Sequence, residues 1–318
     1  MSMLRDGPRP AGLPGGVHLL QRGWLSANSI VFAGRDDDAG VVDTGYVSHA
    51  TQTVSLVEHA IGTRPLSQIV NTHLHSDHCG GNAALQLRWP SASITVPLGY
   101  RSAVDPWNEE QLSFVETGQR CARFCVDGYL QDGDELALGA KVWQVHAAPG
   151  HDPHALMFFE PHSRTLISGD ALWEHRLAII FPELHGDSGF NEAFIALDRI
   201  ERLAPRRVLP GHGAAFTDVA AALAQSRQRL ERYVRLPHRH RDHAVRALVV
   251  YHMLEHRRRE LNDLTAWIVA TPIFRAANAW GTEAGGSALA AAEVVESLMQ
   301  DGLLKCDGSV VTIPEAEM

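Results

Sequence analysis

The first three quarters of the chain alternate short apolar runs with longer amphipathic segments. Runs rich in Val, Ile, Leu and Phe predict β-strands, and apolar positions spaced three or four apart predict helices. The predicted strands cover residues 17–23, 26–34, 41–45, 67–75, 92–97, 134–139, 141–149, 154–161, 164–170 and 206–213. The predicted helices cover residues 48–61, 79–89, 189–203 and 217–235. This alternation of strand, helix and strand favours an α/β fold.

The pattern changes near residue 236, where three helical segments precede a hairpin with Asp307 and Gly308 at its turn. Three helices and a hairpin are typical of a winged helix. We therefore expect a Gly- and Pro-rich flexible tail at 1–16, a main domain at 17–235, and a small winged-helix-like α+β domain at 236–318.

Composition is that of an ordinary globular protein, with 318 residues, 45% hydrophobic and 20% charged. The net charge of −9 excludes a global basic field that would attract nucleic acid or an anionic membrane. The N-terminus carries no apolar core of signal-peptide length, and no apolar run is long enough to span a bilayer. Four scattered cysteines do not form a disulfide framework. We expect a soluble cytoplasmic protein.

The stretch "THLHSDHCGG" concentrates metal-binding side chains at the end of a predicted strand. Neutral imidazole and carboxylate groups are good ligands for Zn²⁺ and similar cations. His73 and His75 are two apart on an extended segment, so they point the same way and can bind one ion. Asp77 and His78 follow the strand and can face a second ion beside the first.

Three further candidates follow apolar runs in small-residue turns. They are His151 in "PGHD", Asp170 in "SGD" and His212 in "PGHG". Loops at strand ends are where α/β proteins usually build their sites. Most of the 18 histidines are ordinary surface or hydrogen-bonded residues, but five histidines and two aspartates in this order predict a site for two metal ions.

At these residues the chain resembles the metallo-β-lactamase superfamily over roughly residues 17–235. "THLHSDH" is similar to its H-x-H-x-D-H signature, and "PGH", "GD" and "PGHG" follow in the family's order. The resemblance implies a four-layer αβ/βα sandwich with a dinuclear metal centre at one edge. These motifs are specific for fold and metal binding, and say little about the substrate.

The resemblance also implies a division of ligands between two divalent ions, zinc by expectation, with iron or manganese as alternatives. One ion takes His73, His75 and His151, the other takes Asp77, His78 and His212, and Asp170 bridges them. Asp43 in "VVDTG" would orient a ligand from behind. Asp170 matches the bridging carboxylate of the glyoxalase II, lactonase and phosphodiesterase branches, so antibiotic hydrolysis is not expected.

The implied reaction is hydrolysis of a small-molecule thioester, lactone or related ester by a hydroxide that bridges two metal ions. Asp77 or Asp170 would accept or relay a proton. We expect the irregular segment 98–131 and the residues after Asp170 to line the pocket. The candidate pocket residues are Trp107, Trp173, Phe181, His185 and His154. Cys79 is expected to pack at the helix start and not to bind metal.

Two alternatives stay open at this point. A phosphodiesterase or RNA nuclease of the same fold is supported only by the Arg-rich region 227–259. A di-iron redox protein belongs to another functional class, but the reductases of that kind carry a carboxylate in place of one histidine and add a flavodoxin domain, and this chain shows neither.

The segment 236–318 carries eight Lys and Arg residues against eleven Asp and Glu residues, so its charge is negative. A DNA-reading module normally has a basic footprint, and this balance argues against DNA binding. We expect this domain to act as a lid or as a homodimer contact.

Overall fold

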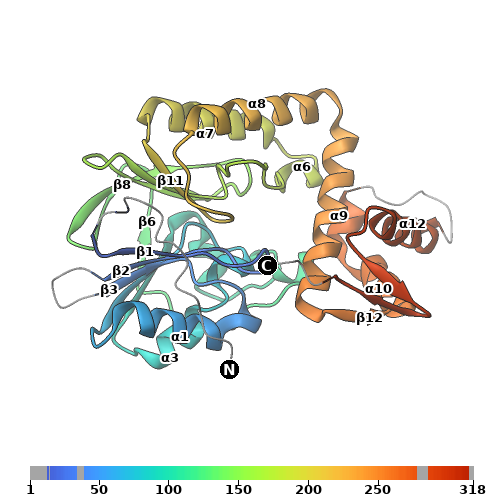
Figure 1. Ribbon diagram of the computed structural model, residues 1–318, viewed down its shortest axis with the longest axis horizontal. Helices are drawn as coiled ribbons and strands as arrows, with labels where there is room; N and C mark the ends of the chain where they lie inside the picture. Colours follow the sequence, from blue (N-terminus) through green and yellow to red (C-terminus); the bar gives the residue numbers. More distant parts are fainter. Residues whose placement is uncertain (1–12, 14, 34–38, 278–285, 315–318) are drawn as a thin grey trace.

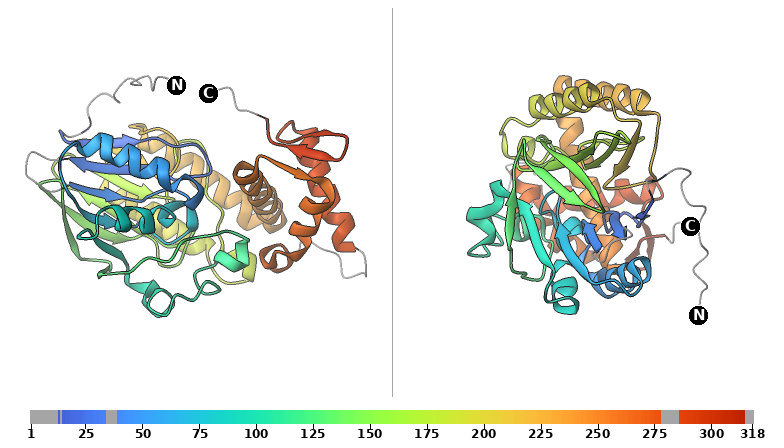
Figure 2. Two further views of the ribbon diagram at one scale, coloured as in Figure 1. Left: turned by 90° about the horizontal axis from the view of Figure 1, so that it is seen from below. Right: turned by 90° about the vertical axis from the view of Figure 1, so that its left-hand side faces the viewer.

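Two β-sheets lie face to face between pairs of helices, with a smaller helical part at one end (Figures 1 and 2). The computed structural model describes residues 13, 15–33, 39–277 and 286–314. The predicted N-terminal tail lies almost entirely outside the described residues. The four-layer αβ/βα arrangement predicted from the sequence is confirmed.

The first sheet contains six strands in sequence order. They are β1 (Val17–Leu20), β2 (Ser29–Ala33), β3 (Ala39–Val42), β4 (Leu66–Val70), β5 (Ser93–Pro97) and β6 (Gly128–Leu130). The strands β1, β2 and β3 are antiparallel, whereas β3 to β6 run parallel. The carboxyl ends of β3 and β4 therefore meet at the same edge.

The second sheet has the order β11-β10-β9-β8-β7. Its strands are β7 (Glu135–Leu138), β8 (Lys141–Ala147), β9 (Leu156–Glu160), β10 (Thr165–Gly169) and β11 (Arg207–Pro210). Only β10 and β11 are parallel, which brings their carboxyl ends together. Every residue of β9 and β10 is buried, as expected for strands covered on both faces.

Each sheet is covered on its outer face by amphipathic helices. Helices α1 (Ala50–Ile61) and α3 (Asn82–Arg88) pack against the first sheet, and α7 (Phe190–Leu203) and α8 (Val219–Arg235) pack against the second (Figure 1). In α7 the buried positions Phe190, Ala193, Leu197 and Ile200 recur every three or four residues. The core between the sheets includes Phe32, Trp143 and Phe158.

Short helical turns occupy the loops near the site edge. They are η1 (Val47–His49), α2 (Ser76–Cys79), η2 (Leu98–Tyr100), α4 (Arg101–Val104), α5 (Phe114–Thr117) and α6 (Pro182–His185). Most of the segment 98–131, predicted to be irregular, consists of these turns and loops.

The C-terminal part contains helices and a small sheet of order β12-β14-β13. Its elements are α9 (Pro237–His256), β12 (Arg258–Glu260), α10 (Leu261–Ala270), α11 (Pro272–Ala276), α12 (Gly286–Gln300), β13 (Lys305–Asp307) and β14 (Val310–Thr312). The predicted hairpin is confirmed. The assignment as a winged helix and the domain boundary at 235/236 stay predictions, although α8 ends at Arg235 and α9 begins at Pro237.

The C-terminal part is not separated from the loops around the site. Its hydrophobic core includes Leu184 of α6, and Phe181 packs against the same core. Helix α11 contacts α5 and α6. None of the helices that the structure describes combines the length and the apolar character needed to cross a membrane.

Candidate metal centre

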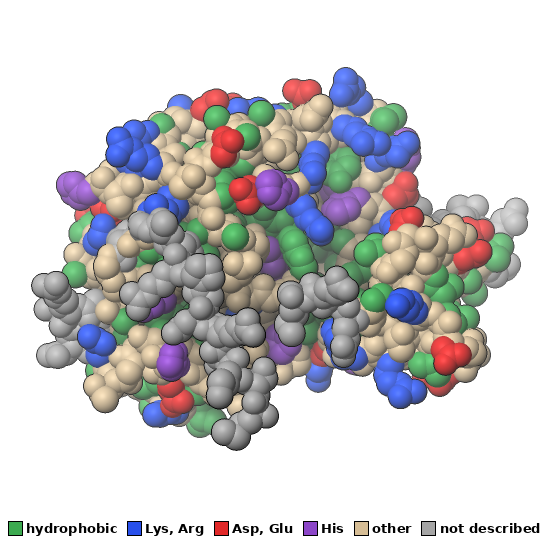
Figure 3. Space-filling model, in the orientation of Figure 1, with side chains coloured by type: hydrophobic (Ala, Val, Ile, Leu, Met, Phe, Trp, Pro, Cys, Tyr) green, Lys and Arg blue, Asp and Glu red, His purple; other side chains and the backbone are tan. Residues whose placement is uncertain are grey.

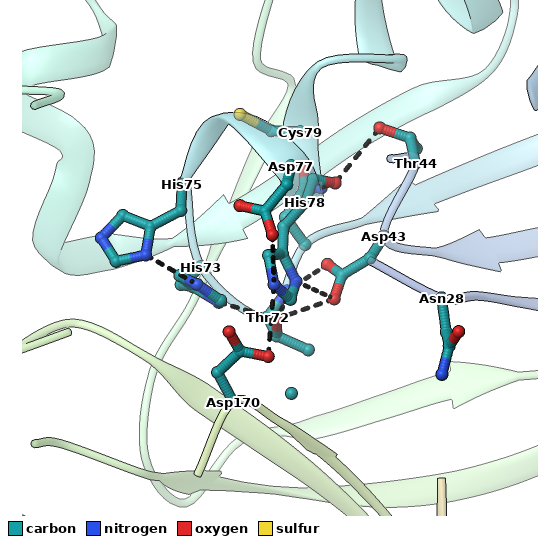
Figure 4. A network of polar contacts seen from close by, with 12 residues as sticks. Asn28, Asp43, Thr44, Thr72, His73, His75, Asp77, His78, Cys79 and Asp170 are labelled. Atoms are coloured by element: carbon teal, nitrogen blue, oxygen red, sulfur yellow. Dashed lines mark hydrogen bonds and ion pairs between the residues drawn. The ribbon is translucent and has the colours of Figure 1, made fainter. Parts of the chain in front are cut away.

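The seven predicted ligands converge at the edge where β3, β4, β10 and β11 end, and Figure 4 shows five of them, His73, His75, Asp77, His78 and Asp170. His73 and His75 follow β4, Asp170 directly follows β10, and His212 comes two residues after β11. His151 lies in the connection between β8 and β9. All except His75 are buried, so this edge gathers polar groups that would be costly to bury without partners.

Strand β4 is shorter than predicted. It ends at Val70, so His73 and His75 lie in the loop that follows the strand. The loop remains extended at His75 (φ −63°, ψ 148°), and the two side chains still point toward a common position. The distances are 3.1 Å from His73 Nε2 to His75 Nδ1, and 2.8 Å from His75 Nδ1 to His151 Nε2. These three nitrogens form one group that could hold a metal ion.

A second group lies beside the first. His212 Nε2 is 3.0 Å from Asp77 Oδ2, and His78 Nε2 is 3.7 Å from the same oxygen. The ligand atoms of Asp77, His78 and His212 all lie within 4.8 Å of one another. A third group, His73, His78 and Asp170, overlaps both trios, so the division of ligands that the family resemblance implies stays a prediction.

Asp170 lies between the two groups. Its Oδ1 is 3.3 Å from His78 Nε2, and its Oδ2 is 3.4 Å from His151 Nε2 and 4.0 Å from His212 Nε2. Each carboxylate oxygen thus faces a histidine of a different trio. Asp170 Oδ1 also accepts a hydrogen bond of 3.1 Å from Trp173 Nε1, which orients the carboxylate.

In each histidine of the first trio, the ring nitrogen that points away from the metal site contacts a neighbouring group. His151 Nδ1 donates to the Ile179 carbonyl at 2.6 Å, and His73 Nδ1 lies 3.0 Å from Thr72 Oγ1. His75 Nε2 faces Asp152 Oδ2 at 3.6 Å. Such contacts fix which nitrogen faces the metal site.

The second trio is oriented by Asp43. Its Oδ2 accepts from His78 Nδ1 at 2.8 Å and from Thr72 Oγ1 at 2.8 Å, while Oδ1 accepts from Thr72 N at 2.9 Å. Asp43 adopts a left-handed backbone conformation (φ 58°), which is uncommon outside glycine and here turns its carboxylate toward His78.

The protonation of His73, His75 and Asp170 suits metal binding, whereas at His78 burial is outweighed by the carboxylates of Asp170, Asp43 and Asp77, which hold the pKa well above its usual value. Burial, followed by repulsion from His151, lowers the pKa of His75 to about 4, and burial holds the pKa of His73 well below its usual value. Burial opposes ionisation of Asp170, but the neighbouring His78 and His212 outweigh it and hold its pKa well below the usual range. Neutral imidazole and ionised carboxylate are the forms that bind divalent metals.

One buried atom provides a direct test of whether the residues fit a metal ion. His78 Nε2 is fully buried and forms no hydrogen bond of ordinary geometry within the described ranges, and its near neighbour is Asp170 Oδ1 at 3.3 Å. A buried nitrogen without a partner costs about 1–3 kcal/mol, and ligation would remove that cost. The donor set of imidazoles and carboxylates is also one that zinc and similar cations prefer.

The predicted pocket residues divide into two sets. Phe181 lies beside the first trio, with ring centroids 4.8 Å from His75 and 5.5 Å from His151, and Trp173 lies 5.1 Å from His212. The other three contact different neighbours: Trp107 packs on Phe114 and Phe124, His154 on Tyr100, and His185 pairs with Glu116 at 3.2 Å.

The sequence reasoning missed several residues that shape the site. Trp24 stacks on His212 with centroids 5.3 Å apart and planes at 7°, yet nothing in its sequence neighbourhood marks it. Asn28 Nδ2 donates to the Pro210 and Gly213 carbonyls at 2.9 and 2.8 Å, which holds the loop that carries His212. Asp152 directly follows His151, and this adjacency is the only sequence feature that could have indicated its place in the site.

Cys79 agrees with its predicted packing role. It is fully buried, its pKa is raised by burial and by Cys121, and its Sγ lies 3.7 Å from Cys121 Sγ. It belongs to none of the groups of described residues that could hold a metal.

This geometry agrees with comparison against known families. Residues 22–212 match the Metallo-beta-lactamase superfamily, so the chain belongs to that superfamily. The match spans all seven predicted ligands, from the first trio to His212.

Among curated relatives, a hydroxyacylglutathione hydrolase from Anaeromyxobacter dehalogenans is 33% identical over 188 residues, covering 59% of this chain and 62% of that protein. An acyl-coenzyme A thioesterase from Gallus gallus is 27% identical over 176 residues, covering 49% of this chain and 59% of that protein. The chain thus spans about 60% of the length of these relatives.

Among solved structures, a metallo-beta-lactamase family protein from Thermus thermophilus aligns with a TM-score of 0.55 and 21% identity, covering 95% of this chain and 100% of its own. A beta-lactamase domain protein from Burkholderia ambifaria gives the same TM-score and identity, covering 97% and 96%. These likenesses extend through the C-terminal part and concern the fold alone.

Proposed function

We propose that the protein is a metal-dependent hydrolase of small thioesters, with lactones and related esters as further substrates. The observation that carries the proposal is the pair of ligand trios with Asp170 between them. The relatives named as an acyl-coenzyme A thioesterase and a hydroxyacylglutathione hydrolase support thioesters as the substrate class.

In this proposal, His73, His75 and His151 hold one divalent ion, Asp77, His78 and His212 hold the other, and Asp170 serves both. Zinc is the proposed metal, with iron or manganese as alternatives, because imidazole and carboxylate ligands suit all three. When bound, such ions supply Lewis acidity for the carbonyl oxygen and lower the pKa of water.

The chain's own residues supply orientation and proton transfer. Asp170 Oδ1 is held by Trp173, which leaves Oδ2 facing the space between the trios. Asp77 Oδ2 faces both His212 and His78, so either carboxylate is placed to accept a proton. Phe181 on one side and Trp24 with Trp173 on the other form apolar walls that exclude water from the acyl group.

The test is a panel of acyl thioesters and lactones on protein loaded separately with zinc, manganese and iron. We expect hydrolysis that a chelator abolishes and that His73→Ala reduces by about a thousandfold or more, because removing a ligand disables the metal centre. The matched control is His162→Ala, which alters an exposed histidine outside the site. Activity unchanged by His73→Ala would refute the proposal.

A phosphodiesterase is the second candidate, favoured by arginines of α8 and α9 near the site. It predicts turnover of a bis-aryl phosphate or of single-stranded RNA in preference to thioesters. The di-iron redox alternative predicts stoichiometric iron and a visible absorption band in protein purified without added metal. Metal analysis and an absorption spectrum on the same sample separate these candidates.

A further inference from the structure

Arg176 extends the site beyond its metal ligands. Its guanidinium carbon lies 4.6 Å from the ring centroid of Trp24, a cation–π contact, and Trp24 in turn stacks on His212. One aromatic ring therefore connects an exposed positive charge to a ligand of the candidate metal centre. Trp24 itself is 42% exposed, so this arrangement borders solvent.

Two further arginines and a histidine near Arg176 come from two helices. Arg229 lies on α8, and His243 and Arg246 lie on α9. Partial burial, followed by the charges of Arg176, Arg229 and Arg246, lowers the pKa of His243, although its ring still reaches solvent. The three arginines, separated by up to 70 positions in sequence, all lie near enough to this one histidine to affect its pKa.

Two of these charges lack an acidic partner. Within the described ranges, neither Arg176 nor Arg229 forms an ion pair, whereas Arg246 binds Asp301 at 2.5 Å. The nearby Glu174 pairs with His175 at 3.3 Å. In a chain of formal charge −9, two exposed arginines without an acidic partner among the described residues are available to an anionic group.

The surface also offers aromatic platforms. Tyr233 stacks on His243 with centroids 6.1 Å apart and planes at 22°, and Trp24 presents a partly exposed ring. Figure 3 shows Lys and Arg side chains gathered where α8 passes into α9, above a hollow with hydrophobic side chains and histidines. Guanidinium groups bind phosphate oxygens in pairs, and aromatic faces stack on nucleobases.

We propose that Arg176 and Arg229, supported by His243 and Arg246, bind the phosphate groups of a nucleotide-bearing leaving group, so that the preferred substrates are thioesters whose thiol carries a phosphorylated nucleotide. This inference rests on the proposed thioesterase function. It assigns the leaving-group end of the substrate to the surface of α8 and α9, and the acyl end to the walls formed by Phe181 and Trp173.

The experiment compares two substrates with the same acyl group, an acyl-coenzyme A and the corresponding acyl-pantetheine, which lacks phosphates. The ratio of their kcat/KM values is measured for the wild type and for the double variant Arg176→Gln/Arg229→Gln. We expect this ratio to fall about tenfold or more, because two charge-assisted contacts are lost. The matched control, Arg206→Gln, removes an exposed arginine just before β11, and we expect it to leave the ratio unchanged.

A second measurement separates docking from catalysis. Calorimetry with ADP, which has phosphates but no thioester, should show binding that the double variant weakens about fivefold or more and Arg206→Gln does not. If ADP binding depends on the two arginines but no thioester is hydrolysed, the proposed function is wrong and the phosphate-binding role of Arg176 and Arg229 stands. If thioesters are hydrolysed but the double variant leaves both the kcat/KM ratio and ADP binding unchanged, only the phosphate-binding role of the arginines is wrong. The same role is also wrong if single-stranded RNA binds more tightly than ADP through these arginines while the kcat/KM ratio is unchanged in the double variant.

Discussion

The carboxylate of Asp43 and the imidazole of His78 form a buried hydrogen bond of 2.8 Å from Nδ1 to Oδ2 (Figure 4). Because His78 Nδ1 is directed at Asp43, Nε2 is the ring atom that faces Asp77 and Asp170. The fold thus sets which nitrogen of His78 is available to a metal ion. The same carboxylate binds Thr72, whose Oγ1 contacts His73, so Asp43 influences both trios.

We therefore predict that Asp43→Asn lowers metal affinity about 10- to 100-fold with little change in fold. Asparagine fits the left-handed backbone at this position, but its amide cannot accept from Thr72 and His78 at the same time. Metal content after dialysis against graded chelator measures the effect, and excess metal should restore activity. Asp263→Asn, at an exposed site on α10, is the control; equal metal retention in both variants would contradict the role of Asp43.

The backbone of Gly211 lies against the Asp170 carboxylate and the His78 ring. A Cβ at this residue would overlap the Asp170 carboxylate and lie 2.9 Å from His78 Cε1, yet the backbone of Gly211 is not in the left-handed region. We predict that Gly211→Ala displaces Asp170 and reduces activity about tenfold or more, since overpacking of this kind costs about 1–3 kcal/mol. Circular dichroism should show a retained fold. Gly23→Ala, where a Cβ meets nothing within 4 Å, should behave as the wild type.

Glu255 of α9 connects the C-terminal part to the loop after β3. It accepts a hydrogen bond of 2.8 Å from the buried Tyr46 hydroxyl and pairs with Arg120. We predict that Glu255→Ala lowers the free energy of unfolding by about 1–3 kcal/mol, because it leaves the Tyr46 hydroxyl without its partner. Urea denaturation measures this change. Glu255→Gln, which keeps an acceptor for the Tyr46 hydroxyl, should lower the free energy of unfolding less. Glu231→Ala, on the exposed face of α8, should change it little.

Glu160 gives a pH-dependent prediction away from the site. Burial opposes its ionisation, but hydrogen bonds from Lys141 and Ser163 outweigh it and lower the pKa of Glu160 to about 2. Because the folded pKa lies below the unfolded value of 4.5, its stabilisation is present above pH ~4.5 and lost as pH falls toward ~2. The difference corresponds to at most about 3 kcal/mol.

Glu160→Gln should therefore destabilise the protein at pH 7 and have a much smaller effect near pH 2. Thermal unfolding of both proteins across this range tests the prediction. A destabilisation that is independent of pH would show that the side chain contributes through packing and not through its charge.

Much of the candidate site was predictable because its ligands follow strands. The apolar runs before His73, Asp170 and His212 predicted the strands that end beside them, and parallel strands bring their carboxyl ends to one edge. The error lay in the length of β4, which stops at Val70. Residues 71–75 form a loop with a bend at Thr72, in which His75 is extended without belonging to the sheet. Hydrophobic pattern alone does not separate a strand from such a loop.

The residues that line the pocket were less predictable from the sequence than the candidate metal ligands. Trp173 and Phe181 lie beside the ligands as expected, but Trp107 follows the same kind of irregular sequence and packs in the core with Phe124. Aromatic side chains suit both environments equally, so only the path of the loop distinguishes a pocket wall from a core residue.

The sequence by itself predicted the strands of the two sheets, their flanking helices and the seven candidate ligands, because periodicity and ligand chemistry are local properties. Only the tertiary structure placed Trp24 on His212, Asp43 behind His78, and Arg176 over the ring of Trp24. These pairs join segments far apart in the chain. Their contacts depend on how the sheets and helices pack, and no short stretch of sequence records that packing.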